Sequence, residues 1–444
     1  MPTPSIVNHP TQPGRTLTPR PLRTNAWRTD ESLDLQFPGH WDVAIMWPAP
    51  PPALTVEEIA EKLDRPVGQP PIAEMSRGKS RPLVIVDDLN RPTPAGLILS
   101  LLLKRFRAIG IPASNVTILI STGTHGPPSL DSLHNKVGPE AASACQILIH
   151  DAKRNCVEVG RTSSGTPVLV DRAVLASDFV MGIGGVYPNN TAGFGGGSKL
   201  ALGVLGFRSI KTLHFRFSGV GWGRPRNRVL RTELDEIARM IRLETIVSVQ
   251  INADREIVRL TCGDHFSYYE DEVAFAQQFF GSPTPEGADV VISNAYPSDL
   301  SLTAALQKGT APLLQASRRA SRIMIASCAE GVGKHGLFPV SKPRYLPVLQ
   351  VARRLSAMKP HELVQAIARR MQGGPRHSKA AETQNPIWIY RPLHGDDNLP
   401  SNIAGYHVVD SWSEVLAGIE REQGTGKRLN VFLYPCAPLQ SLTH

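Results

Sequence analysis

The sequence has no long hydrophobic run and no closely spaced cysteines. No stretch approaches the ~18 consecutive apolar residues of a membrane-spanning helix, and the polar, proline-rich start lacks the apolar centre of a secretory signal. The five cysteines are odd in number and have no CxxC spacing, which favours reduced, buried thiols in a cytosolic protein. We therefore expect a cytoplasmic protein without a membrane partner.

Aromatic residues are scarce, at 6% of the 444 residues, and they do not interleave with the basic ones. A nucleic-acid platform needs that interleaving, so the net charge of +9 does not indicate nucleic acid. The basic excess fits an attraction for anionic substrates or cofactor phosphates, or more simply a solvated basic surface. The sequence leaves the oligomeric state open.

Predicted strands and helices alternate along most of the chain. Apolar strands at 82–86 and 116–120 are each followed by a polar loop and then by a helix, at 95–106 and 130–137. This spacing predicts βαβ units and a parallel sheet, whose ligands gather beyond the carboxyl ends of the strands. The expected fold class is α/β, with two domains of mainly parallel sheets and a cleft between them.

The predicted organisation has four parts. They are a mobile, basic, proline-rich extension (1–32), an N-terminal cofactor-binding α/β domain (33–280), a linker (281–287) and a C-terminal α/β domain (288–444). Further elements are expected as strands at 33–37, 43–46, 247–251, 288–293, 322–326, 387–390 and 430–434, and as helices at 55–63, 233–246, 270–280, 302–307, 344–357, 360–372 and 411–420.

The most informative stretch is the glycine-rich run 184–199, which follows an apolar segment and ends at Lys199. Glycine lets the backbone approach a ligand closely because it has no Cβ. The run departs from the P-loop pattern, which needs Gly directly before the Lys and Ser or Thr after it, whereas Ser198 and Leu200 stand there. A strand, a glycine loop and a helix nevertheless predict a binding site.

Polar residues after other strands add candidates. Asp88 and Arg91 lie on one turn, where a guanidinium binds phosphate bidentately and a carboxylate accepts from ribose hydroxyls; an Asp–Arg pair that caps the next helix is the simpler alternative. His125 follows another strand and is suited to proton exchange, although a solvated loop histidine is equally consistent. Taken singly, Lys199 is consistent with a surface lysine, and His214 with a histidine of a helix or of the core.

Together these pieces resemble the nickel-pincer-nucleotide lactate racemase family. The matching patterns are Asp88-x-x-Arg91-Pro92-Thr93-Pro94, Gly123-Thr124-His125, Gly160-Arg-Thr-x-x-Gly165-Thr-Pro-Val, Ala192-Gly193-Phe194-x-Gly196-Gly197-x-Lys199, His214, Ser293-Asn294-x-Tyr296-Pro297-x-Asp299 and Glu330-Gly331-x-Gly333. The resemblance implies an isomerase, a racemase or epimerase of a lactate-like or larger 2-hydroxy acid. Its reaction would be a reversible hydride transfer to a covalently bound nickel-pincer nucleotide, the nickel complex of pyridinium-3-thioamide-5-thiocarboxylic acid mononucleotide, made by cofactor-synthesis enzymes.

The resemblance also implies residue roles. The implied cofactor-binding residues are Asp88, Arg91, Gly196, Gly197 and Lys199, with Lys199 as the covalent anchor and His214 as the nickel ligand. His125 matches one of two catalytic histidines, which take the hydroxyl proton while hydride passes to the pyridinium ring. The implied substrate-binding residues are Tyr296 and either Gln307 or Lys308.

The chain departs from the family pattern at the second histidine. The family has Pro-His ten residues before the lysine, whereas Pro188-Asn189 stands here, and asparagine cannot act as a general acid or base near neutral pH. Tyr187 is titratable, but its reference pKa of about 10 makes it a slower base. A one-base isomerisation or redox reaction, or a non-catalytic relative that binds a nucleotide or acid, therefore remains as an alternative.

Overall fold

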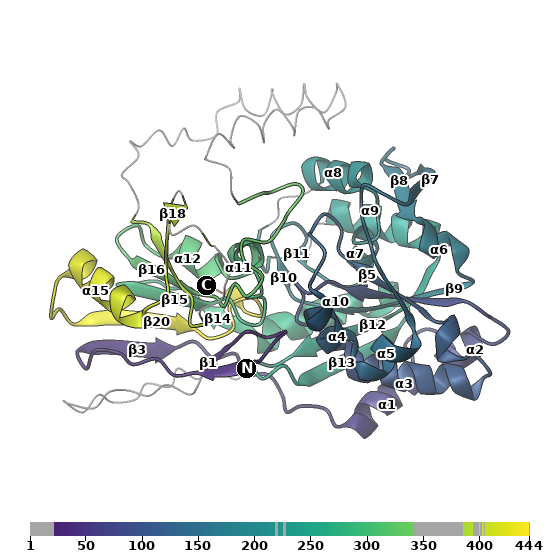
Figure 1. Cartoon of the computed structure of the whole chain (residues 1–444), viewed down its shortest axis with the longest axis horizontal. Coiled ribbons are helices and arrows are strands. Elements are labelled where there is room, and N and C mark those ends of the chain that lie inside the picture. Colours follow the sequence, from purple (N-terminus) through teal and green to yellow (C-terminus); the bar gives the residue numbers. More distant parts are fainter. Residues whose placement is uncertain are drawn as a thin grey trace.

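The computed structural model describes residues 22–217, 221–224, 228–340, 385–393, 399, 402–403 and 405–443. Two sheets with helices packed around them organise this part of the chain (Figure 1). Strands and helices alternate and most strand pairs are parallel, so the α/β fold class is confirmed. The helices expected at 344–357 and 360–372 lie outside the described residues.

The first sheet has six strands in the order β13-β12-β9-β4-β5-β6. Its strands are β4 (Pro82–Asp87), β5 (Thr117–Ser121), β6 (Gln146–Ile149), β9 (Phe179–Gly185), β12 (Leu243–Ile251) and β13 (Ile257–Gly263). Neighbours pair in parallel except β12 and β13, which are antiparallel. The central strands β4 and β9 are buried along their whole length, as expected for a parallel sheet covered on both faces.

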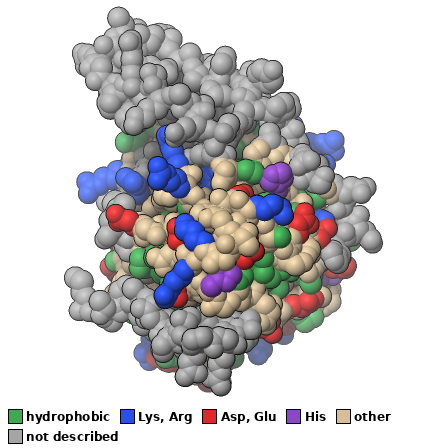
Figure 2. Space-filling model, turned by 90° about the vertical axis from the view of Figure 1, so that its left-hand side faces the viewer, with side chains coloured by type: hydrophobic (Ala, Val, Ile, Leu, Met, Phe, Trp, Pro, Cys, Tyr) green, Lys and Arg blue, Asp and Glu red, His purple; other side chains and the backbone are tan. Residues whose placement is uncertain are grey.

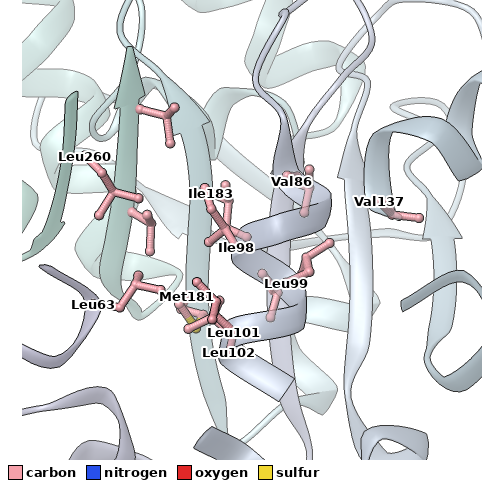
Figure 3. Packing of buried hydrophobic residues seen from close by; sticks show 14 of the residues in the cluster. Leu63, Val86, Ile98, Leu99, Leu101, Leu102, Val137, Met181, Ile183 and Leu260 are labelled. Carbon is pink, nitrogen blue, oxygen red and sulfur yellow. The ribbon is translucent and has the colours of Figure 1, made fainter. Parts of the chain in front are cut away.

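Helix α3 (Ala95–Ala108) provides much of the core on one face of this sheet (Figure 3). Its side chains Ile98, Leu99 and Leu102 are fully buried and lie in one cluster with Val86 and Ile183 of the sheet. Each such burial stabilises the fold by roughly 1.5–3 kcal/mol. The other helices of this half are α1 (Val56–Asp64), α2 (Ile72–Met75), α4 (Leu130–Val137), α5 (Pro139–Ala144), α6 (Arg172–Ala176), α7 (Lys199–Leu202), α8 (Phe207–Arg216), α9 (Arg228–Met240) and α10 (His265–Phe279).

The second sheet has seven strands in the order β18-β19-β17-β16-β15-β20-β3. They are β3 (Trp41–Ile45), β15 (Val290–Asn294), β16 (Ser321–Ile325), β17 (Ile387–Tyr390), β18 (Asn402–Ile403), β19 (Tyr406–Val409) and β20 (Leu429–Tyr434), accompanied by helices α11 (Leu302–Lys308), α12 (Ala311–Gln315) and α15 (Trp412–Gln423). The purple strand β3 pairs in parallel with the yellow β20 (Figure 1), so an early strand completes the late sheet. The domain boundaries themselves stay a prediction.

The segment 22–32 is not the mobile extension that its composition predicts. Leu22 and Trp27 are only 1% and 2% exposed, and β1 (Leu22–Thr24) pairs with β2 (Glu31–Leu33). The strand expected at 33–37 is wrong as well, because pairing ends at Leu33. The carboxylate of Asp299 accepts hydrogen bonds from the Thr24 hydroxyl, at 3.0 Å, and from the backbone N–H of Asn25, at 2.7 Å. A partner far along the chain therefore orders this segment.

Trp27 connects this segment to the loop that carries Asp88. Its indole N–H donates to the Leu89 carbonyl at 2.8 Å, and the Lys136 ammonium lies 4.9 Å from its ring centre. The Arg255 guanidinium lies 4.1 Å from the same ring. The N-terminal segment thus holds the loop that carries Asp88 through contacts made by Trp27.

Short two-stranded pairs complete the described fold. They are β7 (Cys156–Arg161) with β8 (Pro167–Asp171), β10 (Pro188–Asn189) with β11 (Gly193–Phe194), and β14 (Gly281–Pro283) with β21 (Ser441–Thr443). The first half of the expected linker 281–287 is therefore a paired strand.

The surface carries charges of both signs. On the face seen in Figure 2, Lys and Arg side chains lie dispersed, with Asp and Glu side chains among them. Within the described part of the chain, no helix combines the length and apolar character needed to cross a membrane.

Candidate active site

A cavity of about 440 Å³ lies beyond the carboxyl ends of the adjacent strands β9, β4 and β5. Its lining includes residues from the loops after all three strands and from α7, α8 and α11. The expected site residues that line it are Asp88, Arg91, His125, Asn189, Gly196, Gly197, Lys199, His214, Gln307 and Lys308. Tyr187 and Tyr296 are not part of this lining.

The glycine loop is held in place by Arg231, which the sequence did not single out. Gly196 and Gly197 have φ of 75° and 54°, values that favour glycine, and a Cβ on Gly196 would lie 2.4 Å from the Val186 side chain. The Arg231 guanidinium donates to the Gly196 carbonyl at 2.9 Å and stacks 3.9 Å from the ring centre of Tyr269. This support fixes the path of the loop into Lys199.

Lys199 begins the short helix α7 with its side chain at the cavity. Burial lowers the pKa of its amine to about 7, and the nearby positive charges of Arg91 and Arg231 add to this effect. A lysine near its pKa at neutral pH has a large fraction of nucleophilic neutral amine. The residue is therefore suited to a covalent bond with a ligand.

His214 lies on α8 as an oriented, neutral imidazole. Its Nδ1–H donates to the Ile210 carbonyl at 2.9 Å, which leaves the ring lone pair on Nε2. Burial, followed by the charge of Lys199, lowers the pKa of His214 to about 4. This is the form of histidine that binds a metal, with its other nitrogen held by a carbonyl.

A metal here would need ligands from outside the protein. In the part of the chain that the structure describes, no group of three or more His, Cys, Asp or Glu side chains is arranged to hold a metal ion. One histidine alone does not complete a metal site. The donor set therefore fits a metal that arrives bound to a cofactor.

His125 is paired with Asp88. Its Nδ1 lies in hydrogen-bonding contact with Asp88 Oδ2, which also accepts from the Asn90 amide at 3.1 Å. Burial raises the pKa of Asp88, but the contact with His125 and the charge of Arg91 outweigh it, so that its pKa lies well below the usual value. A charged Asp88 fixes the proton on Nδ1 and leaves Nε2 of His125 as a base, as in hydrolytic triads.

The Asp88 loop is fastened by a buried ion pair that the sequence did not reveal. The Lys136 ammonium is fully buried and donates to Asp87 Oδ1 at 2.7 Å and to the carbonyls of Asp88, at 3.1 Å, and Arg91, at 3.0 Å. The other oxygen of Asp87 accepts from the Gly185 N–H at 2.9 Å. One lysine thus joins the loop after β4 to α4, while Asp87 joins it to the end of β9.

The helix-capping alternative for Asp88 and Arg91 is not what the structure shows. The N-cap of α3 is Pro94, without a side-chain cap, and the Arg91 guanidinium donates to the Asn90 carbonyl at 3.3 Å. Arg91 lines the cavity. Burial lowers the pKa of both Lys199 and Lys308, and the charge of Arg91 lowers them further. The guanidinium of Arg91, with the two lysine side chains beside it, makes the cavity suited to phosphate or carboxylate groups.

The two residues considered in place of the second histidine differ in position. Asn189 lines the cavity, and its Oδ1 accepts from the backbone N–H groups of Thr191 and Ala192 at 2.9 and 3.0 Å. Tyr187 lies in the hydrophobic core, and burial raises its pKa. This placement gives the predicted role of Tyr187 as a base no support: the sequence could not show that its ring turns into the core, over Gly185.

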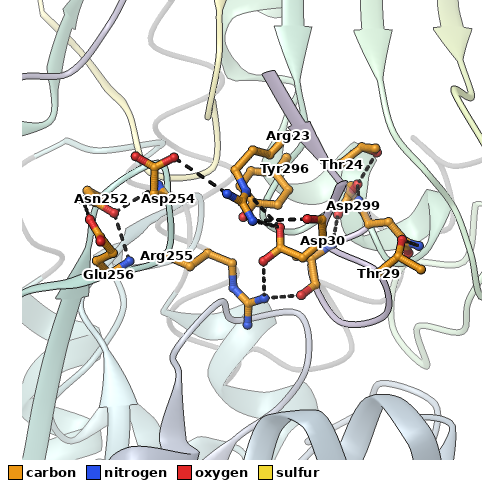
Figure 4. A network of polar contacts seen from close by, with 12 residues as sticks. Arg23, Thr24, Thr29, Asp30, Asn252, Asp254, Arg255, Glu256, Tyr296 and Asp299 are labelled. Carbon is orange, nitrogen blue, oxygen red and sulfur yellow. Dashed lines mark hydrogen bonds and ion pairs between the residues drawn. The ribbon is translucent and has the colours of Figure 1, made fainter. Parts of the chain in front are cut away.

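Tyr296 also differs from the prediction. It is 1% exposed, packs with Trp27 and Leu300, and donates its hydroxyl to Asp30 Oδ1 at 2.9 Å (Figure 4). This placement gives the predicted substrate-binding role of Tyr296 no support, because its ring packs against the N-terminal segment.

His335 is the cavity residue that the sequence missed. It lines the cavity and its ring centre lies 4.9 Å from that of His125. The segment that carries it bridges the His125 loop: the Gly126 N–H donates to the Lys334 carbonyl at 3.2 Å and the Gly336 N–H to the Thr124 carbonyl at 2.8 Å. In the sequence, His335 is a single histidine two residues after the Glu330-Gly331-x-Gly333 pattern, and nothing there indicates that it lies at the cavity.

Known proteins similar to this chain in sequence are lactate racemases. The lactate racemase N-terminal domain family matches residues 29–221. Lactate racemase of Lactiplantibacillus plantarum is 28% identical over 297 residues, covering 64% of this chain and 69% of that protein. Lactate racemase of Thermoanaerobacterium thermosaccharolyticum is 25% identical over 295 residues, with the same shares covered.

Solved structures share the fold. The lactate racemase apoprotein from Thermoanaerobacterium thermosaccharolyticum superposes with a TM-score of 0.69 at 20% identity, covering 96% of this chain and 100% of that chain. A structural genomics target from Thermotoga maritima gives a TM-score of 0.59 at 13% identity, covering 89% and 100%. This chain is therefore similar to the lactate racemases in sequence, carries a match to their N-terminal domain over residues 29–221, and shares the fold of a solved lactate racemase apoprotein.

Proposed function

We propose that this protein is a racemase or epimerase of a 2-hydroxy acid that works with a covalently bound nickel-pincer nucleotide. The observation that carries the proposal is the convergence of Lys199, His214 and His125 on one cavity. An amine with a pKa of about 7, a neutral oriented imidazole and a carboxylate-paired histidine are three different chemical functions. A protein that merely binds a nucleotide needs none of this combination.

Three side chains and two glycines would hold the cofactor in the cavity. Lys199 would provide the covalent link, His214 the protein's nickel ligand, and Arg91 a bidentate contact to the phosphate. Glycines 196 and 197 give the backbone room beside the lysine. When bound, the nickel-pincer nucleotide supplies the acceptor for the substrate's α-hydride.

The substrate side is built around His125 and Lys308. Nε2 of His125 would take the substrate's hydroxyl proton, and the charged Asp88 would stabilise the imidazolium that results. Lys308 is 7% exposed and lines the same cavity, as does Gln307, so that both are placed to bind a carboxylate. The protein's tasks are to orient the acid, to move one proton and to exclude water.

A single-base form of this reaction is favoured by Asn189. Its carbonyl oxygen is engaged with two backbone N–H groups, and an amide does not titrate near neutral pH. His125 would then both remove and return the hydroxyl proton, with the oxidised acid turning between the two steps. The same residues would serve an isomerisation of a larger 2-hydroxy acid.

The test is production of the protein together with the cofactor-synthesis enzymes, followed by intact mass, nickel analysis and assay of both enantiomers of several 2-hydroxy acids. We expect a covalent adduct of mononucleotide size that Lys199→Ala abolishes, and nickel that His214→Ala loses while the adduct remains. Arg91→Lys should lower adduct occupancy, since lysine keeps the charge but not the planar fork. An adduct that persists in Lys199→Ala, or a loaded protein inactive on every acid, would contradict the proposal.

A further inference from the structure

His335 has its ring fixed by its own backbone. Its Nδ1 accepts hydrogen bonds from the N–H groups of Leu337 and Phe338, both at 3.1 Å. A nitrogen that accepts two N–H groups carries the lone pair, so the proton of the neutral ring lies on Nε2. The ring lines the cavity, and Nε2–H is the polar group that it can offer there.

The surroundings keep this ring neutral. Burial lowers the pKa of His335 to about 2, and His125, His214 and Lys308 add to this effect, against a smaller opposing contribution from Asp88. Protonation would also require a hydrogen on Nδ1, which would break both backbone hydrogen bonds. His335 therefore cannot act as the second acid or base that Asn189 fails to provide.

We propose that His335 is a hydrogen-bond donor, held in its Nε2–H form, to the substrate oxygen whose proton His125 removes. The inference rests on the proposed function and specifies one more residue of the same site. Its geometric basis is the ring pair: His125 and His335 lie 4.9 Å apart at 69° and are joined by a backbone bridge, so both face the same part of the cavity.

The donor stabilises the reaction without changing its own protonation. In the proposed reaction the hydroxyl O–H bond would break and its proton would go to Nε2 of His125, and the C–H bond would break with its electron pair leaving as hydride. The cofactor, when bound, would supply the hydride acceptor. A C=O bond forms, and His335 keeps its proton throughout. A neutral imidazole can polarise such an oxygen, and a preorganised donor acts most strongly where charge develops in a water-poor site.

Two substitutions of His335 distinguish the loss of the Nε2–H donor from the loss of the hydrogen bonds that Nδ1 accepts from the backbone. Asparagine in His335→Asn places its carbonyl oxygen near Nδ1, so it can still accept from Leu337 and Phe338 but has no donor at the position of Nε2. Glutamine in His335→Gln reaches the position of Nε2 with an amide N–H but gives up the acceptor near Nδ1. Loss of activity in the first variant with recovery in the second identifies the donor.

The first measurement uses the protein without cofactor. Long-range ¹H–¹⁵N spectra of protein labelled in its histidine rings, assigned with His335→Asn, should show His335 as a neutral Nε2–H ring that does not titrate between pH 5 and 8. Added lactate should shift its Nε2–H signal. A ring protonated on Nδ1, a titration inside this range, or no shift at saturating lactate would overturn the inference, whatever the enzyme's activity.

The second measurement uses the loaded enzyme and its turnover of both lactate enantiomers. We expect kcat in His335→Asn to fall by roughly 10²–10³-fold, the usual loss for one such donor, with a smaller change in KM, and His335→Gln to recover part of it. Equal losses in both variants, or a kcat in His335→Asn close to wild type, would refute the donor role. A loaded wild-type enzyme that is inactive on every 2-hydroxy acid assayed would refute the proposed function instead, while the spectra still decide the state of His335.

Discussion

Replacing Lys199 by methionine should remove a pH dependence of folding stability that this one amine causes. The pKa of Lys199 is about 7 in the folded protein, against about 10.4 for an exposed lysine of the unfolded chain. Between these values the unfolded state binds more protons, so the free energy of unfolding rises with pH. At about 1.4 kcal/mol per pKa unit, Lys199 should contribute a gain on the order of 2 kcal/mol between pH 7 and pH 9.

The assay is reversible urea unfolding of the cofactor-free protein at the two pH values. Other groups also titrate, so the quantity to compare is the pH 9 minus pH 7 difference in wild type and in Lys199→Met, whose side chain is similar in length but uncharged. Lys62→Met, on the exposed side of α1, controls for the loss of a lysine. The reasoning is refuted if the free energy of unfolding changes between pH 7 and pH 9 by the same amount in Lys199→Met as in wild type. It is also refuted if the wild-type protein loses stability between pH 7 and pH 9 and Lys199→Met removes that loss.

Three further substitutions test the contacts around the cavity. Asp88→Asn should lower kcat by about 10²–10⁴-fold while the covalent adduct remains, because His125 loses the charge that stabilises its imidazolium; unchanged kcat would contradict the pair. Lys136→Met should cost about 3–5 kcal/mol in urea unfolding, since it leaves the buried charge of Asp87 without its cation, and a cost below ~1 kcal/mol would show that the pair is dispensable. Asn189→His keeps an acceptor for the loop and adds a titratable nitrogen, so the loaded enzyme should racemise lactate faster than wild type, and equal rates would mean that no second base is missing.

The regular part of the fold follows from local patterns. The apolar run at 82–86 and the helical run at 95–106 appear as β4 and α3, with ends shifted by one or two residues. Parallel strands bring the loops after β4, β5 and β9 to one edge of the sheet, which is why the sequence could gather residues such as Asp88 and His125 into one site.

The rest depends on contacts between residues far apart in the chain. Arg231 holds the glycine loop from a helix that follows it, and Lys136 meets Asp87 across 49 positions. Neither residue stands in a pattern that spacing alone reveals. The same holds for His335, which reaches the cavity only because its segment bridges the His125 loop.

The ordered segment around Trp27 has a practical consequence. By composition the first residues look like a dispensable tail, and starting an expressed version at residue 33 would be a natural choice. Such a version would lack the indole that donates to the Leu89 carbonyl and lies against the Lys136 ammonium. It would also remove the Thr24 and Asn25 partners of Asp299. If a protein shortened in this way were inactive, the cause would be the loss of these contacts around the Asp88 loop. Its inactivity would not be evidence about which reaction the full-length protein catalyses.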